Sequence, residues 1–307
     1  MLDADIIKSN FNAGRIGREI IVYKSTSSTN DIAAQCANGG EKNDGIVILA
    51  EQQTAGRGRR ANKWLSQTGK SILCSVLLCD TGIAPNIIPL VSAVAAAEAI
   101  DRAAFKNVIA RSEATKQSQL PRGLRAHPTR RDCHAALAMT SGIFRDAHKF
   151  VHVGSKIKWP NDIFLADRKV AGILIDGIVR AGQKFYVLGI GINCHQTRED
   201  FSSELRDTAT SIDIQTGGVC DRNKIVAELL TNLERYLAVA SDNPAGIIEK
   251  WQSRNMLSGR KITVEHNGQR FTGNCIGIEP TEGLIIQLES GAVRTFNAAF
   301  TTVVKSF

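Results

Sequence analysis

The sequence predicts an α+β protein, with a larger domain built on a mixed or antiparallel sheet with helices and a small C-terminal SH3-like β-barrel. Strand-like apolar runs mix with helical patterns up to residue 256, whereas only short strand patterns follow from residue 257. A chain of 307 residues fits one large and one small domain better than a single unit. We therefore expect domains at residues 1–256 and 257–307.

The first half is predicted to contain a short helix, two buried strands and a core helix. Polar N-cap candidates at 28–31 precede the run IAAQCAN, and Gly39-Gly40 follows it as a helix stop. The apolar runs at 45–50 and 71–79 are strand-like, and a polar loop rich in Gly and Arg joins them. Residues 86–104 form an Ala-rich pattern that is typical of a core helix.

The second half begins with four strand patterns that we expect to pair antiparallel. They read KIKW, DIFLA, KVAGILIDGIV and KFYVLGIGIN, between residues 156 and 193. Helical patterns at 222–239 and 244–254 then close the larger domain. In the tail, KITVEH, QRFTGNCIGI, LIIQL and VRTFNA are separated by Gly-containing turns, and Asn267-Gly268 strongly indicates a hairpin. A module of about fifty residues with this pattern has the size of an SH3-like barrel.

Residues 108–150 interrupt this layout and are predicted to be a surface insertion. They join the core helix to the KIKW strand, where a few residues normally suffice. They also carry five of the eight net positive charges of the chain. Their text resembles the mobile palindromic coding elements of some reduced intracellular bacterial genomes. The basic charge is therefore weak evidence for a nucleic-acid partner.

Composition excludes several classes of protein. An apolar fraction of 43% and a charged fraction of 22% argue against a disordered chain. No run reaches the roughly 18 apolar residues of a membrane helix, and the N-terminal residues lack the pattern of a secretory signal. We expect a cytoplasmic protein with no membrane association.

Seven cysteines without any CxxC favour reduced thiols over a disulfide framework. Cys74 and Cys79 lie on a predicted buried strand, and the Cys194-His195 pair is isolated in the sequence. Small apolar core residues are a better interpretation of these cysteines than a zinc site. No metal ligands are therefore predicted.

The stretch from Glu51 to Leu78, EQQTAGRGRRANKWLSQTGKSILCSVLL, is the most informative in the chain. Its glycines allow backbone amides to approach a ligand, its arginines can bind phosphate or carboxylate, and Trp64 adds an aromatic surface. This combination favours an anionic ligand, although a solvated basic loop has the same composition. The end Gly69-Lys70-Ser71 is not a P-loop, because Trp64 stands where that motif needs glycine.

Two further stretches bring polar groups to strand ends. In KIKWPNDIFLADRKVAGILIDG, Lys158 enters a turn at Pro160 and Lys169 begins a later strand, so both ammonium groups can face one phosphate-binding pocket. Taken singly, each lysine is more easily an exposed side chain with no role. GIGIN, at 189–193, adds two glycines and an amide, but Cys194 takes the last position of a GxGxxG motif.

In this order, GRGRR, KWPND and RKVAGIL make the chain resemble the biotin protein ligase family, from about Ser25 to the C-terminus apart from the insertion. The resemblance implies a class II aminoacyl-tRNA synthetase-like catalytic domain. It also implies an enzyme that adenylates biotin with ATP and Mg²⁺, then transfers biotin to a lysine of a biotin carboxyl carrier protein of an acyl-CoA carboxylase. Bifunctional members need an N-terminal DNA-binding domain. Too few residues precede Ser25 for one, so we expect a monofunctional ligase that does not bind DNA.

The resemblance also implies roles for particular residues. The loop containing Arg57, Gly58 and Arg59 would order over biotin and its adenylate, and Lys169 would hold the biotin carboxylate and the α-phosphate. Lys169 and Arg59 are thus the catalytic candidates. The other biotin contacts would come from Ser28, Thr29, Asn30 and Gln53, and the ATP contacts from Arg57, Trp64, Lys158, Asn161, Lys169 and Asn193.

These residue types suit the reaction. The biotin carboxylate must attack the α-phosphorus of ATP and expel pyrophosphate, so cations must bring two anions together and neutralise developing charge. The carrier lysine then attacks the mixed anhydride and AMP leaves, with no covalent enzyme intermediate. The chain accordingly shows no clear Ser-His-Asp or Cys-His signature.

Three alternatives remain open from the sequence. A lipoate protein ligase shares the fold and the adenylation chemistry, but not GRGRR or the C-terminal barrel. A biotin-binding regulator without catalytic activity and a non-catalytic nucleic-acid module are the others. The sequence does not distinguish a monomer from a homodimer. It also leaves two roles open for the barrel: to help close the active site over ATP, or to help dock the carrier protein. Many members have Gly-Arg where this chain has Ala61-Asn62, so closure of the arginine loop can differ here.

Overall fold

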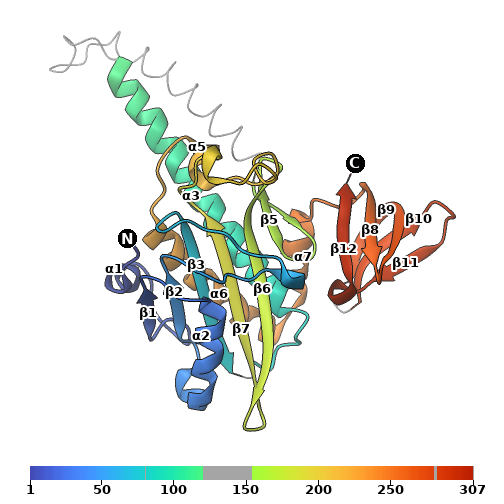
Figure 1. Cartoon of the computed structure of the whole chain (residues 1–307), viewed down its shortest axis with the longest axis horizontal. Coiled ribbons are helices and arrows are strands. Elements are labelled where there is room, and N and C mark those ends of the chain that lie inside the picture. The colour runs from blue at the N-terminus through green and yellow to red at the C-terminus, as the bar shows by residue number, and fades with distance from the viewer. Residues whose placement is uncertain (80, 120–153, 280–281, 307) are drawn as a thin grey trace.

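The computed structural model describes residues 1–79, 81–119, 154–279 and 282–306, which form two β-sheets with flanking helices (Figure 1). The larger sheet has seven strands in the order β1-β2-β3-β7-β6-β5-β4. They are β1 Ile20–Tyr23, β2 Val47–Ala50, β3 Ser71–Cys79, β4 Lys156–Lys158, β5 Asp162–Leu165, β6 Arg168–Arg180 and β7 Gln183–Asn193. β1 runs parallel to β2 and the other neighbours are antiparallel, so the predicted mixed sheet is confirmed.

The helices include all those predicted and two short ones that the sequence did not indicate, α1 and α5. They are α1 Ala4–Ser9, α2 Thr29–Cys36, α3 Ile88–Gln119, α5 Ile212–Thr216, α6 Arg222–Asp242 and α7 Ala245–Arg254, with 3₁₀ turns η1 Ala37–Asn43, η2 Arg59–Ala61, η3 Arg198–Asp200 and η4 Ala298–Phe300. No helix in the described ranges combines the length and the apolar character needed to cross a membrane.

Helix α3 is longer than the sequence predicts. The Ala-rich pattern at 86–104 corresponds to its first half, and the helix continues without a break to Gln119. Residues 108–119, which we assigned to the start of an insertion, therefore continue this helix. The remainder of that segment, 120–150, lies outside the described residues.

Strand β3 is apolar along almost its whole length, as suits a strand with helices packed on both faces of the sheet (Figure 1). All nine of its residues are buried. Ile72, Val76 and Leu78 pack in the core that includes residues of α3 and α6, whereas Leu77 packs with Ala33 of α2 on the opposite face. Burial on both faces removes the polar alternation that a half-exposed strand would show.

The second sheet is antiparallel, with five strands in the order β11-β10-β9-β8-β12. They are β8 Lys261–His266, β9 Gln269–Glu279, β10 Gly283–Leu288, β11 Val293–Phe296 and β12 Thr301–Ser306. The predicted hairpin at Asn267-Gly268 joins β8 to β9, and both residues have the positive φ (49° and 79°) that its tight turn requires. Strand β12 is missing from the sequence prediction, because TTVVKS has only two apolar residues.

A buried ion pair connects the end of β2 to α6. Glu51 accepts a hydrogen bond from Arg222, with 2.8 Å between Oε2 and Nη1, and both side chains are less than a tenth exposed. The backbone N–H of Leu2 also donates to Glu51. Burial raises the pKa of Glu51, but these contacts outweigh it and the net pKa is lowered. The ionised pair therefore stabilises the fold at neutral pH, and this stabilisation is lost as the pH falls through the lowered pKa.

Glu51→Leu is expected to lower the free energy of unfolding by roughly 3 to 5 kcal/mol, because it leaves Arg222 buried without its anion. Guanidinium unfolding at pH 7 measures this loss. Asp207→Ala is the control, since it breaks the exposed Arg198–Asp207 pair and should change stability little. Equal stability of Glu51→Leu and the unaltered protein would show that the buried pair does not stabilise the fold.

Candidate active site

One pocket contains every predicted site residue except Asn193. Its walls come from the start of α2, the loop between β2 and β3, the β4–β5 turn, β6, β7 and β12. The predicted residues that line it are Ser28, Thr29, Asn30, Gln53, Arg57, Gly58, Arg59, Trp64, Lys158, Asn161 and Lys169. The topology thus brings together stretches that lie more than a hundred residues apart in the sequence.

A network of polar side chains lies where α2 meets β3 and β7, and its centre, Thr29, Asn30 and Ser75, is buried. Gln53 Oε1 accepts hydrogen bonds from the backbone N–H of Thr29 at 2.7 Å and from its hydroxyl at 2.9 Å. Ser75 Oγ lies 2.7 Å from Thr29 Oγ1 and 2.6 Å from Asn30 Oδ1. Asn30 Nδ2 in turn donates to Asp176 at 2.9 Å. These bonds fix the rotamers, so the network presents an ordered set of donors and acceptors to the pocket.

Three glycines on β6 and β7 make room for the side chains above them. A Cβ atom on Gly189 would lie 2.2 Å from Asn30 Oδ1, and one on Gly191 would lie 2.6 Å from the Trp64 ring. A Cβ atom on Gly172 would meet the same ring at 2.9 Å. The glycines of GIGIN therefore act through the space they leave, as glycines in strands often do at ligand sites. The buried indole nitrogen of Trp64 has no hydrogen-bond partner among the described residues.

Cations gather where the β4–β5 turn meets β6. Lys169 Nζ lies 2.7 Å from Asp162 Oδ1 and 5.7 Å from the centre of the Trp64 ring. Burial lowers the pKa of Lys158, an effect that Asp162 opposes and Lys169 reinforces. Burial, together with a neighbouring arginine, also lowers the pKa of Arg59. Asp162 is the only carboxylate among the described lining residues, so the pocket has the excess positive charge that a phosphate or carboxylate ligand needs.

The arginine loop, residues 57–60, contacts the segment that carries η4 and β12 of the second sheet. Arg59 donates to the carbonyl of Ala298, and Arg60 donates to the hydroxyl of Thr302. Residues 301–303 of β12 line the pocket beside the loop. The C-terminal sheet therefore forms part of the wall around the cations.

Asn193 lies outside the pocket lining, in contrast to the other predicted residues. Its side-chain nitrogen donates to the carbonyl of Thr210 at 3.0 Å, and its oxygen accepts from Gln196 at 3.1 Å. The residue is only 6% exposed. In this conformation its amide holds the end of β7 in place and does not face the pocket.

Sequence reasoning misses several groups that shape the site. Asp176 contacts Asn30 and lies 3.5 Å from Arg57, but on β6 it looks like an ordinary exposed residue. Ser75 lies on β3, whose other residues are almost all apolar, so the run reads as a core strand with no site residue. A polar residue in such a strand is a usable signal, because a buried hydroxyl needs a partner. Residues 301–303 are not expected at the site, because the sequence pattern does not predict strand β12, which carries them.

Comparison with known proteins identifies the family. A family model described as the Biotin/lipoate A/B protein ligase family matches residues 22–193, more than half of the chain. The chain belongs to this family. A related ligase, the bifunctional ligase/repressor BirA of Bacillus spizizenii, is 28% identical over 285 residues, which cover 92% of this chain and 74% of that protein. The biotin--[acetyl-CoA-carboxylase] ligase of Mycobacterium tuberculosis is 28% identical over 258 residues, which cover 83% and 78%.

A solved structure of the ligase family confirms the predicted catalytic fold. The biotin protein ligase from Aquifex aeolicus in complex with biotin and ATP superposes with a TM-score of 0.67 and 21% identity. The match covers 94% of this chain and all of that one. The family match begins in β1 and ends at the last residue of β7, so it contains every predicted site residue.

Proposed function

We propose that this chain is an ATP-dependent biotin protein ligase. In the first step, the biotin carboxylate attacks the α-phosphorus of ATP, biotinyl-5′-AMP forms and pyrophosphate leaves. In the second step, the neutral amine of a lysine on a biotin carboxyl carrier protein attacks the acyl carbon, an amide forms and AMP leaves. Membership of the ligase family and the similarity to named biotin ligases support this assignment.

The observation that carries the proposal is the composition of this pocket. It combines a network of polar donors and acceptors, buried at its centre, with a cluster of cations. Biotin has a neutral, polar ureido ring joined to a carboxylate, and ATP brings the phosphates that this carboxylate must approach. Both substrates therefore find matching chemistry within one cavity.

Thr29, Asn30 and Gln53 are proposed to bind the ureido ring, with Ser28 beside them along the biotin tail. A buried ureido group exposes two N–H donors and one carbonyl acceptor, each of which needs a partner. The network supplies amide and hydroxyl groups that are already held in place by Ser75. Little ordering is then required when biotin binds, which favours affinity.

Lys169 and Arg59 are proposed to hold the biotin carboxylate and the α-phosphate together. Before substrates bind, Lys169 is paired with Asp162 at 2.7 Å. Exchange of Asp162 for substrate oxygens keeps the ammonium group paired throughout the reaction. As the carboxylate attacks, negative charge grows on the phosphate oxygens, and cations already fixed beside them stabilise it.

The remaining predicted contacts belong to the nucleotide and to the loop. Trp64 is proposed to pack beside the nucleotide and to donate its unpaired indole N–H to it. Lys158 and Asn161 would contact the phosphates from the β4–β5 turn, and the loop residues Arg57 and Gly58 would cover the adenylate. A contact from Asn193 to ATP would require release of its present hydrogen bonds.

Mg²⁺ would accompany ATP, and the pocket fits an ion that is held mainly by phosphate. Mg²⁺ usually keeps several waters and takes one or two carboxylates from the protein. Asp162 and the amide oxygen of Asn161 are the oxygen ligands that the β4–β5 turn offers. When bound, the ion would neutralise phosphate charge and favour the departure of pyrophosphate.

We assign the sheet of β8–β12 to a separate C-terminal domain, residues 257–307, and propose that it is an SH3-like barrel. Its contacts with Arg59 and Arg60 support a role in closing the pocket over ATP. The larger domain would then be residues 1–256.

The biotin carboxyl carrier protein of an acyl-CoA carboxylase is the proposed protein substrate. The ligase and this carrier would meet in the cytoplasm.

A lipoate ligase is the second candidate, since the family includes both activities in its name. A dithiolane ring has no N–H or carbonyl group, so lipoate would leave the side-chain amides of Gln53 and the buried Asn30 without new partners. The test is to incubate the protein with ATP, Mg²⁺, an apo biotin carrier domain or an apo lipoyl domain, and either acid. We expect labelling only of the biotin carrier, and only with biotin. Labelling with lipoate alone would assign the protein to the other branch of the family.

Gly189→Ala is expected to weaken biotin binding by roughly tenfold or more, because its Cβ atom would displace the Asn30 amide. Isothermal titration calorimetry with biotin measures the change. Gly177→Ala is the matched control on the same sheet, since the nearest atom to its Cβ would be 4.0 Å away, on Tyr186. Unchanged affinity in Gly189→Ala would place the biotin ring elsewhere.

A further inference from the structure

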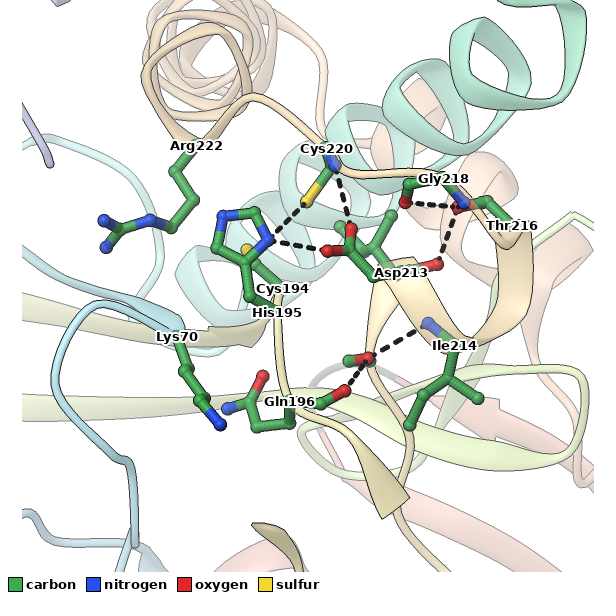
Figure 2. A network of polar contacts seen from close by, with 12 residues as sticks. Lys70, Cys194, His195, Gln196, Asp213, Ile214, Thr216, Gly218, Cys220 and Arg222 are labelled. Atoms are coloured by element: carbon green, nitrogen blue, oxygen red, sulfur yellow. Dashed lines mark hydrogen bonds and ion pairs between the residues drawn. The ribbon is translucent and has the colours of Figure 1, made fainter. Parts of the chain in front are cut away.

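A second cluster of reactive side chains lies outside the pocket, beyond the end of β7. His195 Nδ1 lies 2.7 Å from Asp213 Oδ2 and 3.9 Å from Cys220 Sγ (Figure 2). These three ligand atoms all lie within 4.8 Å of one another. Cys194 is in side-chain contact with Cys220 and adds a second thiol beside the group. None of these residues lines the pocket or has a part in the proposed ligation.

The cluster is not built as a nucleophilic triad. In such a triad the histidine uses one ring nitrogen for the nucleophile and the other for the carboxylate. Here Asp213 and Cys220 both approach the same nitrogen, Nδ1 (Figure 2). Cys220 is also only 4% exposed, and its contact with Cys194, together with burial, raises the pKa of its thiol. An unionised, buried thiol has neither the charge nor the access that a nucleophile needs.

Three ligand atoms of different types within 4.8 Å of one another are instead a group that a metal ion can bind. Zinc binds thiolate, imidazole nitrogen and carboxylate oxygen, and tetrahedral bonds of normal length place its ligand atoms about 3.3 to 3.8 Å apart. The separations of 2.7 Å and 3.9 Å lie on either side of this range, so small side-chain rotations would admit an ion. Coordination would release two protons to solvent, one from the Cys220 thiol and one from His195 Nδ1, because zinc binds a thiolate and the free lone pair of an imidazole nitrogen.

We propose that His195 Nδ1, Asp213 Oδ2 and Cys220 Sγ form a binding site for Zn²⁺. The His195 and Asp213 side chains are 25% and 20% exposed, so an ion can enter from that side and keep a water as its fourth ligand. In the sequence Cys194-His195 is an isolated pair, which favours a core role over a metal site. Asp213 and Cys220, which follow 18 and 25 residues after His195, complete the set only in the fold.

The place of the cluster gives the ion a bracing role. His195 lies two residues after β7, Asp213 lies on α5, and Cys220 lies just before α6, so one ion would join three segments. The chain between His195 and Asp213 includes residues 208–210, which form backbone hydrogen bonds with Lys169 in both directions, each at 2.8 Å. A bound ion would therefore fix the segment that supports the backbone of Lys169.

Metal binding tests the proposal without any assay of ligation. The purified full-length protein is stripped with a chelator, and Zn²⁺ is titrated in competition with a chromophoric chelator. We expect about one Zn²⁺ per chain. Cys220→Ser should weaken the affinity by at least about 100-fold, because loss of a direct ligand exceeds the 10- to 100-fold effect of removing an outer partner. Asp213→Asn, which keeps the volume of the side chain, should also weaken binding.

Controls separate this site from general binding to thiols. Cys36→Ser removes a half-buried cysteine outside the cluster and should leave Zn²⁺ affinity unchanged. Co²⁺ in place of Zn²⁺ should give a thiolate-to-cobalt absorption band in the unaltered protein and none in Cys220→Ser, while circular dichroism shows that both are folded. Equal Zn²⁺ affinity in the unaltered protein and Cys220→Ser, or no cobalt–thiolate band, would overturn the proposal and leave the cluster as a His195–Asp213 ion pair.

Discussion

Lys169→Ala is expected to reduce biotinyl-adenylate formation by roughly 100-fold or more, while the fold and its melting temperature stay unchanged. The lysine is the cation proposed to hold the biotin carboxylate and the α-phosphate. Loss of one preorganised group that stabilises developing negative charge typically costs a factor of about 10² to 10³ in rate. Its side chain is about one third exposed, so the substitution removes little packing. Pyrophosphate release under single-turnover conditions, with biotin and ATP saturating, measures the effect.

Lys156→Ala is the matched control for this substitution. Lys156 lies on β4, close in sequence to the cationic cluster, but its side chain is exposed and outside the pocket. Its removal should leave the adenylation rate unchanged. Near-normal turnover in Lys169→Ala would show that the lysine has no catalytic role, even if the ligase assignment stands.

Arg59→Gly has the second large expected effect: it should slow adenylate formation and, above all, weaken retention of the adenylate. Arg59 bridges the loop to the Ala298 carbonyl and lies 3.4 Å from Asn161. The substitution removes a cation from the proposed phosphate site. It also loosens the loop, because glycine gives the backbone more conformational freedom. The reactive adenylate should then escape and acylate lysines at random. Mass spectrometry of biotin on added albumin, compared with labelling of the carrier, measures this escape.

Two controls separate the causes of that escape. Arg59→Ala removes the guanidinium without the added backbone freedom, so it should show most of the leakage if charge and contact dominate. Arg180→Gly changes an exposed arginine at the end of β6 and should show none. If Arg59→Gly labels albumin no more than the unaltered protein does, the loop does not retain the adenylate.

Much of the fold could be predicted because its signals are local. The run at 71–79 is apolar enough to require burial on both faces, and it is β3 with the predicted bounds. The Asn267-Gly268 turn fixes its hairpin through backbone conformation alone. By contrast, β1 has only four residues, and it becomes a strand by pairing in parallel with β2. No local pattern specifies that partner.

The site shows the same division between local and long-range information. Lys158, Lys169 and the arginine loop stand out by residue type and spacing, and the structure places them around one pocket. Asp176 contributes by its register on β6, which carries it beside Asn30, 146 positions away in the chain. The His195, Asp213 and Cys220 group likewise depends on how α5 packs against the end of β7. Contacts of this kind follow from tertiary packing and have no signature in a single sequence.

Single-turnover adenylation is the most direct measurement of the central claim. The protein is mixed with Mg²⁺ and ATP labelled at the α-phosphate, with biotin, with lipoate or with neither acid, and without any carrier. Biotin ligation predicts labelled biotinyl-5′-AMP that forms only with biotin, stays bound to the protein through gel filtration, and is discharged as AMP when apo carrier is added. The absence of an adenylate with biotin, or its formation with lipoate alone, would contradict the account.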